Sequence, residues 1–230
     1  MDEEIEEVLC YEDPEEEYEL ADQAPYKIDL NMDNSNNVTP SIEGHRLEAE
    51  TQGTSASSEN RKIRYFIIRS ASASNVIISV EEFAWSTMKM NEQKLGDAFR
   101  SSDEVRLIFS INNSGAFQGY ARMSTLPGRL GRQVLWEGGR TFGHPFGVEW
   151  ITLTCLPHAE CMHLRNPFSQ NRQVGIARDG TEVPDDVGDQ IVALMAKKWR
   201  AAGQPSLSAQ LQEAQQMRFS GRGIWGGGGM

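Results

Sequence analysis

The chain has 230 residues, enough for one domain of ordinary size with flanking segments. No uninterrupted apolar run approaches the roughly 20 residues that a membrane-spanning helix needs, and no apolar N-terminal run resembles a secretory signal. Its cysteines, 3 in number, do not suggest a disulfide framework, so we expect a soluble intracellular protein with reduced thiols.

Charge divides the chain into two unequal parts. Residues 1–60 contain 18 of the 33 acidic side chains and only 2 of the 22 basic ones, whereas residues 61–230 carry 20 basic and 15 acidic side chains. The first part has few aliphatic side chains to offset the entropy of ordering, so we expect it to be disordered. Two interpretations of this acidic segment stay open. It either mimics nucleic acid and competes for the basic part, or it is a solvated tail that docks a protein partner.

The globular pattern opens with a run of β-branched and aromatic residues at 63–68, which is typical of a buried strand. The polar segment 69–75 follows, and its small side chains predict a loop with accessible backbone groups at the strand end. After an apolar stretch at 76–83 comes Trp85, which precedes two hydroxyl side chains. A tryptophan beside hydroxyls and a donor-rich strand end can hold a flat ligand with polar edges, such as a base. The alternative is that Trp85 is an ordinary core residue.

The middle of the chain predicts a helix and several strands. Residues 91–99 have apolar positions at helical spacing, with Asn91 as the N-cap. The β-type runs 105–111 and 117–123 flank an Asn-Asn-Ser-Gly turn and predict an antiparallel hairpin. After two glycine- and arginine-rich loops, residues 146–153 predict another strand.

Toward the C-terminus, Asp179-Gly180 follows the run 174–178 and predicts a further hairpin. Residues 188–199 have apolar residues at helical spacing and two lysines near their end, as a helix C-terminus favours. We therefore expect one folded domain over residues 61–200. Residues 201–230 form a low-complexity, glycine-rich tail that we expect to be disordered, apart from one amphipathic turn at 207–217.

Four side chains that zinc accepts lie close together, at Cys155, His158, Cys161 and His163. Their spacing lacks the two ligand pairs and long gap of structural zinc sites, so we expect no metal site. The sequence also has no nucleophile elbow, P-loop, zinc-protease helix or dinucleotide fingerprint. We expect a protein that is not an enzyme and needs no cofactor.

Aromatic and basic residues recur in the segments between the predicted strands and helices. Aromatic planes interleaved with arginines suit single-stranded nucleic acid, because each stacked base contributes roughly 1–3 kcal/mol while cations hold the phosphates. Core packing explains any one of these aromatic residues, but Trp136 and Phe142 lie in or beside glycine-rich loops, where we expect less burial. The set comprises Trp85, Trp136, Phe142, Arg69, Arg129, Arg132, Arg140 and Arg178.

Several motifs occur in order between about residue 61 and residue 194, and they are RYFIIRS, Trp85-Ser86-Thr87, NEQKLGDAFRSS, LIFSINNSGAFQGYARMS, FGVEWI, HLRNPF and IARDGTEV. Together they resemble a YTH domain, and they are most similar to the nuclear branch of that family, the readers of N6-methyladenosine in RNA. The resemblance implies an α/β, PUA-like fold with a six-stranded, barrel-like sheet surrounded by helices.

The same resemblance assigns roles to individual residues. It implies an aromatic cage for the methylated base, with walls from Trp85, Trp136 and Phe142. It implies contacts to the polar edge of the base from Ser70, the Ala71 amide, Asn75, the Ser86 carbonyl and Thr87. It implies contacts to the RNA backbone and the neighbouring nucleotide from Arg69, Arg178, Asp179 and Asn91.

The function implied is non-catalytic recognition of N6-methyladenosine in single-stranded RNA by a monomer acting in mRNA processing or fate. A buried methyl group contributes roughly 0.8 kcal/mol, and an apolar cage leaves no acceptor for the second N–H of unmodified adenine. Two alternatives stay open: a general single-stranded nucleic-acid binder without methyl selectivity, and an adaptor that binds proteins through residues 1–60. The resemblance favours the nucleus, with the cytoplasm as the alternative.

Overall fold

The computed structural model describes residues 61–219. The segments 1–60 and 220–230, and with them most of the predicted disorder, lie outside the described residues. Of the helices in the described range, none is both long and apolar enough to cross a membrane.

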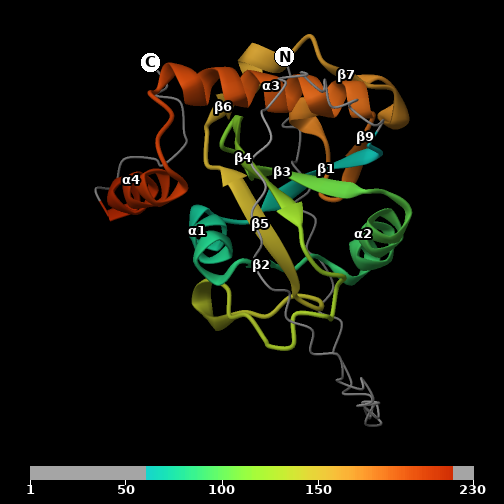
Figure 1. Ribbon diagram of the computed structural model, residues 1–230, viewed down its shortest axis with the longest axis vertical. Helices are drawn as coiled ribbons and strands as arrows, with labels where there is room; N and C mark the ends of the chain where they lie inside the picture. The colour runs from blue at the N-terminus through green and yellow to red at the C-terminus, as the bar shows by residue number, and fades with distance from the viewer. Residues whose placement is uncertain (1–60, 220–230) are drawn as a thin grey trace, which may run out of the picture. The chain divides into compact units, whose positions relative to one another are not determined.

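The described region is a mixed α/β domain, as the sequence predicts (Figure 1). Its α-helices are α1 (Ala73–Glu82), α2 (Lys89–Ser101), α3 (Asp185–Ala201) and α4 (Leu207–Phe219). Its strands are β1 (Ile63–Ser70), β2 (Ala84–Trp85), β3 (Glu104–Ile111), β4 (Ala116–Met123), β5 (Phe146–Thr152), β6 (Leu156–Pro157), β7 (Arg165–Asn166), β8 (Arg172–Gln173) and β9 (Thr181–Val183). Short 3-10 helices are η1 (Glu137–Gly139), η2 (His158–Cys161), η3 (Pro167–Ser169) and η4 (Val174–Ile176).

Six strands of the main sheet follow the order β2-β5-β4-β3-β1-β9, and β6 pairs with the N-terminal end of β4. The strands β1 and β3 are parallel, and β3 and β4 form the predicted antiparallel hairpin. Gly119 lies in β4 at φ +146, and a Cβ there would lie 2.1 Å from the Thr152 carbonyl oxygen, so this close approach of β4 to β5 requires glycine. Within residues 61–219 the hydrogen-bonded ladders connect these six strands in one path, and none joins β2 to β9.

The strand β1 is buried on both faces because its side chains alternate between two cores. Phe66 and Ile68 belong to the core that includes side chains of α1 and α2. Tyr65 and Ile67 belong to the core that includes Val187, Ile191 and Met195 of α3. Figure 1 shows α1 and α2 flanking the sheet and α3 crossing above it. The end of β1 is therefore fixed from two sides.

Two local predictions near β1 are wrong. The first two residues of the segment 69–75 end β1, and its last three begin α1. Only Ala71 and Ser72 lie between these elements, and the Ser72 side chain caps α1 by accepting a hydrogen bond from the Asn75 amide. Asn91 is not the N-cap of α2, because that helix begins at Lys89. Its amide side chain instead donates to Asp179 Oδ2 at 2.8 Å, and this charge-assisted contact ties α2 to the segment before β9.

The predicted hairpin at Asp179-Gly180 is also wrong. The run before it contains η4, and the strand after it, β9, pairs antiparallel with β1. The turn residues are held by β1 as well, since the Gly180 amide donates to the Ile67 carbonyl at 2.9 Å. Pairing with a distant buried strand has overridden the local turn signal.

The C-terminal prediction needs a correction too, because α4 occupies residues that we expected to be mostly disordered. Leu207 and Leu211 pack on the core, and Ala214 is buried, a spacing of four and three residues that gives one apolar stripe. The helix contacts α1 and β5. Its Gln210 side chain accepts a hydrogen bond from the Leu153 amide at 2.8 Å, so α4 completes the backbone bonding just beyond β5.

Candidate functional site

An aromatic cluster lies where β2, the η1 turn and the loop before β5 meet. Trp85 is the last residue of β2 and pairs with Phe146 of β5. Trp136 immediately precedes η1, and its ring centroid lies 5.0 Å from that of Trp85 at an interplanar angle of 65°. Phe142, in the loop that leads to β5, lies 6.4 Å from Trp136 between centroids. The three aromatic residues predicted as cage walls therefore form one contiguous cluster.

Burial differs among the three rings. Trp85 and Trp136 are 5% and 3% exposed, whereas Phe142 is 43% exposed. Trp85 also packs edge-on against Phe109 of the core at 4.9 Å. The expectation that Trp136 is less buried is wrong, because its ring turns from the glycine-rich loop into the cluster.

The indole nitrogen of Trp136 is unsatisfied. Trp136 Nε1 is the buried side-chain donor that has no hydrogen-bond partner within residues 61–219. Leaving such a donor unpaired costs roughly 1–3 kcal/mol. A native fold retains this cost where a functional role offsets it, so the position of Trp136 points to a role in binding.

The N-terminus of α1 holds the Trp136 turn in place. Asn75 is 5% exposed, and its Oδ1 accepts a hydrogen bond from the Glu137 amide at 2.9 Å. The Ser74 hydroxyl donates to the Glu137 carboxylate. Asn75 Nδ2 has no hydrogen-bond partner among the described side chains and backbone, so it can still donate to a ligand.

The other end of the same loop is held by α2. The Glu92 carboxylate accepts hydrogen bonds from the His144 amide at 2.6 Å and from His144 Nδ1 at 3.0 Å. Gly143 lies so close to α2 and to the segment before it that an added Cβ would meet the Glu92 carboxylate and lie 2.6 Å from the Thr87 carbonyl oxygen. The segment that carries Trp136 and Phe142 is thus fastened at both ends.

The predicted base-edge residues lie around this cluster. Ser70 is buried at the end of β1, and its hydroxyl donates to the Ser72 carbonyl at 2.7 Å. Ala71 is exposed between β1 and α1, which leaves its backbone at the surface. Ser86 and Thr87 are buried directly after β2. These positions come from three segments that converge at the ends of β1 and β2.

Asp179 is half-buried and accepts several hydrogen bonds from the protein. It accepts hydrogen bonds from the Arg69 amide at 2.8 Å, from Asn91 Nδ2 and from the Thr87 hydroxyl at 3.3 Å. Burial raises the pKa of the Asp179 carboxyl, and these hydrogen bonds oppose the rise. The network joins β1, α2 and the start of β9, so Asp179, Asn91 and Thr87 position the site from within.

The guanidinium of Arg69, which is predicted to contact a phosphate, contacts oxygens of the protein. Its guanidinium donates to the Ala177 carbonyl at 2.8 Å, the Gly175 carbonyl at 2.6 Å and the Ser110 hydroxyl at 2.7 Å. Burial lowers its pKa, and nearby Asp179 opposes this. Arg178, in contrast, is exposed and forms no ion pair with any residue in the described range. The phosphate contacts predicted for Arg178 and Arg69 stay predictions, and Arg178 is the more exposed of the two.

Comparison with known proteins identifies the fold around this cluster. The YTH family, described as the YT521-B-like domain, matches residues 63–196, more than half of the chain. The chain belongs to the YTH domain family.

Relatives of this YTH domain come from several organisms, and two plant proteins are among the most similar. A zinc finger CCCH domain-containing protein 45 of Oryza sativa is 38% identical over 135 residues, covering 57% of this chain and 20% of the relative. The 30-kDa cleavage and polyadenylation specificity factor 30 of Arabidopsis thaliana is 37% identical, covering 57% and 21%. The chain thus spans about a fifth of the length of these curated relatives.

A solved YTH domain has a nucleic acid bound. The crystal structure of the Toxoplasma CPSF4 YTH domain in complex with a 7-mer m6A-modified RNA has a TM-score of 0.56 and 36% identity to this chain. The match covers 60% of this chain and 93% of the Toxoplasma chain. The similarity in fold therefore extends over nearly all of the Toxoplasma domain.

The YTH domain brings some of the sequence-predicted residues together and separates others. The aromatic residues and Asn75 converge on one site, whereas Asp179 and Asn91 serve its support. Sequence reasoning missed Ser74, Glu92 and Gly143, whose contacts hold the Trp136 and Phe142 loop. No sequence signal marked these three residues, because each acts through a partner that is distant along the chain.

The four zinc-type side chains are elsewhere in the YTH domain. In the part of the chain that the structure describes, no three histidine, cysteine or acidic residues are grouped as a metal site would require. The His158 ring packs edge-on against Phe117 at 4.6 Å, and burial, with a smaller effect of Arg69, lowers the pKa of His158 to about 4. The Cys161 thiol donates to the Pro157 and His158 carbonyls, and burial raises its pKa to about 11.

Proposed function

We propose that this YTH domain binds single-stranded RNA that carries N6-methyladenosine, with the methylated base enclosed by Trp85, Trp136 and Phe142. The observation that carries the proposal is the aromatic cluster itself, in which Trp136 contacts Trp85 and keeps an unpaired indole N–H beside the available amide of Asn75. The Toxoplasma relative, crystallised with m6A-modified RNA, supports the same ligand class. Binding needs no catalytic step, and we propose a reader that is not an enzyme.

Selectivity for the methyl group follows from the chemistry of the cluster. Three aromatic faces give the methyl apolar contacts, and burying one methyl contributes roughly 0.8 kcal/mol. An unmodified adenine has a second N–H that would face those rings without an acceptor, which costs roughly 1–3 kcal/mol. Asn75 Nδ2 can donate to the ring nitrogen on the Watson-Crick edge, and the Ser86 carbonyl can accept the N–H that the methylated base retains. The site rejects bare adenine mainly by leaving a proton unpaired.

The base enters only after Trp136 moves. A ring inserted between two aromatic faces needs about 7–8 Å between them, because each contact takes roughly 3.5–4.0 Å. Trp85 and Trp136 are 5.0 Å apart and inclined at 65°, so Trp136 occupies part of the space that the base requires. We infer that the ligand displaces the Trp136 ring, whose backbone stays anchored through Glu137. Because the indole nitrogen of Trp136 has no hydrogen-bond partner within residues 61–219, moving the ring does not break a hydrogen bond of this side chain.

The first test compares two oligoribonucleotides that differ only in one methyl group, titrated against the full chain by fluorescence anisotropy. We expect tighter binding of the methylated strand. Phe142→Ala should reduce that preference about 10-fold, since one aromatic contact to a base is worth roughly 1–3 kcal/mol, and should barely affect stability because Phe142 is 43% exposed.

Exposed Leu135, at 66%, provides a matched control that precedes Trp136 but is no member of the ring cluster. Leu135→Ala should leave the methyl preference unchanged. Equal affinity of the wild-type chain for both oligoribonucleotides would contradict the proposal and favour a general single-strand binder.

We also propose a nuclear role in mRNA processing. The name of the Arabidopsis relative, a cleavage and polyadenylation specificity factor, supports this placement. Imaging a tagged full chain in its own cells tests it, and uniform exclusion from the nucleus would contradict it. Docking of proteins by the acidic residues 1–60 is a separate proposal, which a pull-down with that segment alone tests.

A further inference from the structure

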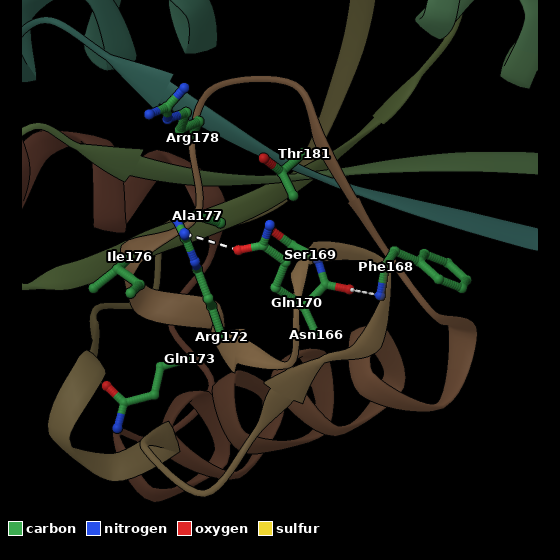
Figure 2. Close-up of a pocket in the computed structure, with 10 residues that line it drawn as sticks. All are labelled: Asn166, Phe168, Ser169, Gln170, Arg172, Gln173, Ile176, Ala177, Arg178 and Thr181. Carbon is green, nitrogen blue, oxygen red and sulfur yellow. Dashed lines mark hydrogen bonds between the residues drawn. The ribbon is translucent and has the colours of Figure 1, made fainter.

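Two hollows of the described region differ in character. The one in Figure 2 is lined mainly by polar and charged side chains, among them Arg178, which is predicted to contact a phosphate. The other, which we call the α4 hollow, has a volume of about 240 Å³ and lies where the end of α3, the turn after it and α4 meet the residues after β5 (Figure 1). Its apolar lining consists of Leu153, Trp199, Ala202, Pro205, Ala214 and Met217. Most of these residues lie beyond residue 196, where the family match ends.

One face of α4 lines this hollow, and it is not the face that packs on the core. Leu207 and Leu211 pack on the core. Four other residues of α4 line the hollow, and they are Gln210, Glu213, Ala214 and Met217. Their positions, three, four and seven residues after the first, place them on one side of a helix. A second side of α4 is therefore turned toward a space that the described chain does not fill.

Hydrogen bonds fix the walls of the α4 hollow. Trp199 Nε1 donates to the Pro205 carbonyl at 2.9 Å, and the Gln204 amide donates to the Trp199 carbonyl at 3.0 Å, so the turn after α3 is closed on itself. Gln210 accepts a hydrogen bond from the Leu153 amide at 2.8 Å, which holds α4 against the residues after β5. The hollow is therefore formed before any occupant arrives, and an occupant need not order its walls.

The size and chemistry of the α4 hollow favour a single aromatic side chain. Its volume of about 240 Å³ is below the roughly 300–1,000 Å³ of small-molecule sites. Trp199 and Met217 are half-buried in its wall, and an indole face and a thioether both pack well against a ring. Glu213 is exposed at the hollow, no ion pair among the described residues involves it, and no lysine or arginine of the described range is in the lining. A basic residue near the aromatic one would complement this charge.

The sequence after α4 contains both of these residue types. Residues 220–230 read SGRGIWGGGGM, so the large apolar pair Ile224-Trp225 stands between glycines. The same segment carries Arg222 and no acidic residue, which complements Glu213 of the hollow. Glycines on both sides leave the backbone free to turn where a bulkier residue would resist.

The distance along the chain allows this segment to reach the hollow. Trp225 follows the last residue of α4, Phe219, by six residues, and six extended residues span roughly 20 Å. Ala214 of the lining precedes Phe219 by five residues, which is roughly 7.5 Å along a helix. A short flexible tether also gives its end a high effective concentration, so even a weak contact is populated.

We propose that the α4 hollow binds the indole of Trp225, so that the segment after α4 turns back over this helix and covers the Cys155 thiol. The indole packs against Trp199 and Met217. Cys155 is a half-buried free cysteine in the lining, and the docked segment shields it from solvent. The hollow shares no residue with the aromatic cluster, so this inference does not rest on the proposed function.

The test follows alkylation of the full-length chain by N-ethylmaleimide, with each modified cysteine assigned by mass spectrometry. Cys155 should react about 10-fold faster in Trp225→Ala than in the wild-type chain, because the reagent reaches this thiol only while the hollow is open. Cys161, which is 1% exposed, should stay unmodified in both chains and so reports that the domain is folded. Met230→Ala removes another apolar side chain of the same segment and should leave the rate at Cys155 unchanged.

A second measurement keeps Trp225 in place. In an Ile224→Cys chain, the thiol introduced beside Trp225 should form a disulfide with Cys155 in oxidised glutathione. Gly229→Cys is the matched control, since its thiol is on the same tether but four residues beyond the indole, and it should form this bond about 10-fold more slowly. Both chains also carry Cys10→Ser, so that no thiol of residues 1–60 competes.

Each outcome supports or overturns the inference. Equal alkylation rates of Cys155 in the wild-type and Trp225→Ala chains would overturn it. If Trp225→Ala also exposes Cys161, that variant has lost the fold and the cross-link decides, with equal rates for positions 224 and 229 rejecting the docked segment. If dilution of the wild-type chain speeds alkylation of Cys155, a second copy covers the hollow and the inference is wrong. Trp225→Ala should keep the methyl preference of the wild-type chain, so failure of the proposed function would leave this inference standing.

Discussion

At the scale of single residues, the aromatic cluster shows that one tryptophan can pack in the core and also border the proposed binding site. Trp85 packs against Phe109 of the core on one side and Trp136 on the other. By these contacts Trp85 is a core residue that also borders the proposed cage. Replacing it tests folding and binding together, whereas Phe142, which is 43% exposed, separates the two.

His158 gives a prediction on pH. Because its pKa falls from an ordinary value near 6.5 to about 4 in the folded chain, the unfolded chain binds more protons between these values. The free energy of unfolding should therefore decrease as the pH falls from about 6.5 toward 4, and His158 contributes its full stability only above about 6.5. Urea unfolding at a series of pH values measures this. His158→Gln should remove this component.

The exposed His163 is the control for this experiment. His163→Gln should show the same loss of stability on acidification as the wild-type chain. If His158→Gln and the wild-type chain lose stability in parallel over that pH range, burial of His158 is not the cause.

Residue identity predicted the ring cluster but not the direction of polar side chains. Asn75 was predicted to contact the base, and it also holds the Glu137 amide. Arg69 and Asp179 were predicted to meet RNA, yet their charged groups bond inside the protein. Sequence gives the type of a side chain, whereas the partners of Arg69 lie more than a hundred residues away at Gly175 and Ala177. Such long-range contacts cannot be worked out from local patterns.

At the scale of elements, the decisive unit is the loop from Trp136 to Pro145, which carries two of the three rings. Asn75 fixes its start through Glu137, and Glu92 of α2 fixes its end through His144. The two anchoring helices lie on opposite sides of β2 in sequence. Both ends of the loop are therefore held by hydrogen bonds, whereas the aromatic rings that it carries can change position.

Gly143→Ala tests whether the close contact at this end of the loop positions its rings. The added methyl would meet the Glu92 carboxylate and lie 2.6 Å from the Thr87 carbonyl oxygen, a backbone atom that cannot move aside easily, so the loop must shift away from Thr87 and α2. We expect the methyl preference to fall about as much as in Phe142→Ala, because the same ring is displaced. Anisotropy with the paired oligoribonucleotides measures it.

Thr141→Ala is the loop control, since Thr141 is exposed and adjacent to Phe142. It should leave both affinities unchanged. A Gly143→Ala chain with normal methyl preference would show that the loop reaches the ligand without its contact to Thr87.

Element prediction succeeded where local signals agreed with the long-range pairing. The hairpin of β3 and β4 is confirmed, because its turn residues and alternating pattern both specify it. The helix α1 was missed although Ser72 and Asn75 mark its start, because the small polar residues of that segment are equally typical of a loop. The strand β9 was missed as a partner of β1 because it has only three residues.

At the scale of the whole molecule, the described region extends past the family match, which ends at residue 196, to the helix α4. This helix closes the core next to α1 and β5, with Gln210 bonded to the Leu153 backbone. The helix α4 therefore packs on the domain although it lies beyond the predicted boundary at residue 200.

Gln210→Ala tests the contribution of α4. Removing this side chain leaves the Leu153 amide without its buried partner, which should lower the free energy of unfolding by about 1–3 kcal/mol. Gln212→Ala, an exposed change on the same helix, should cost little. Chemical denaturation of the two full-length variants compares them, and equal stabilities would show that α4 contributes nothing through Gln210.

The pairing of β1 with β9 determines when the main sheet is completed during synthesis of the chain. The strand β1 acquires its outer neighbour only when residues 181–183 emerge from the ribosome, after every other strand of the main sheet in the described range. Until then the backbone N–H and C=O groups on one edge of β1 are unpaired and open to pairing with a strand of another molecule. Translation products that stop before residue 181 should aggregate, whereas those that reach the end of α4 should stay in solution.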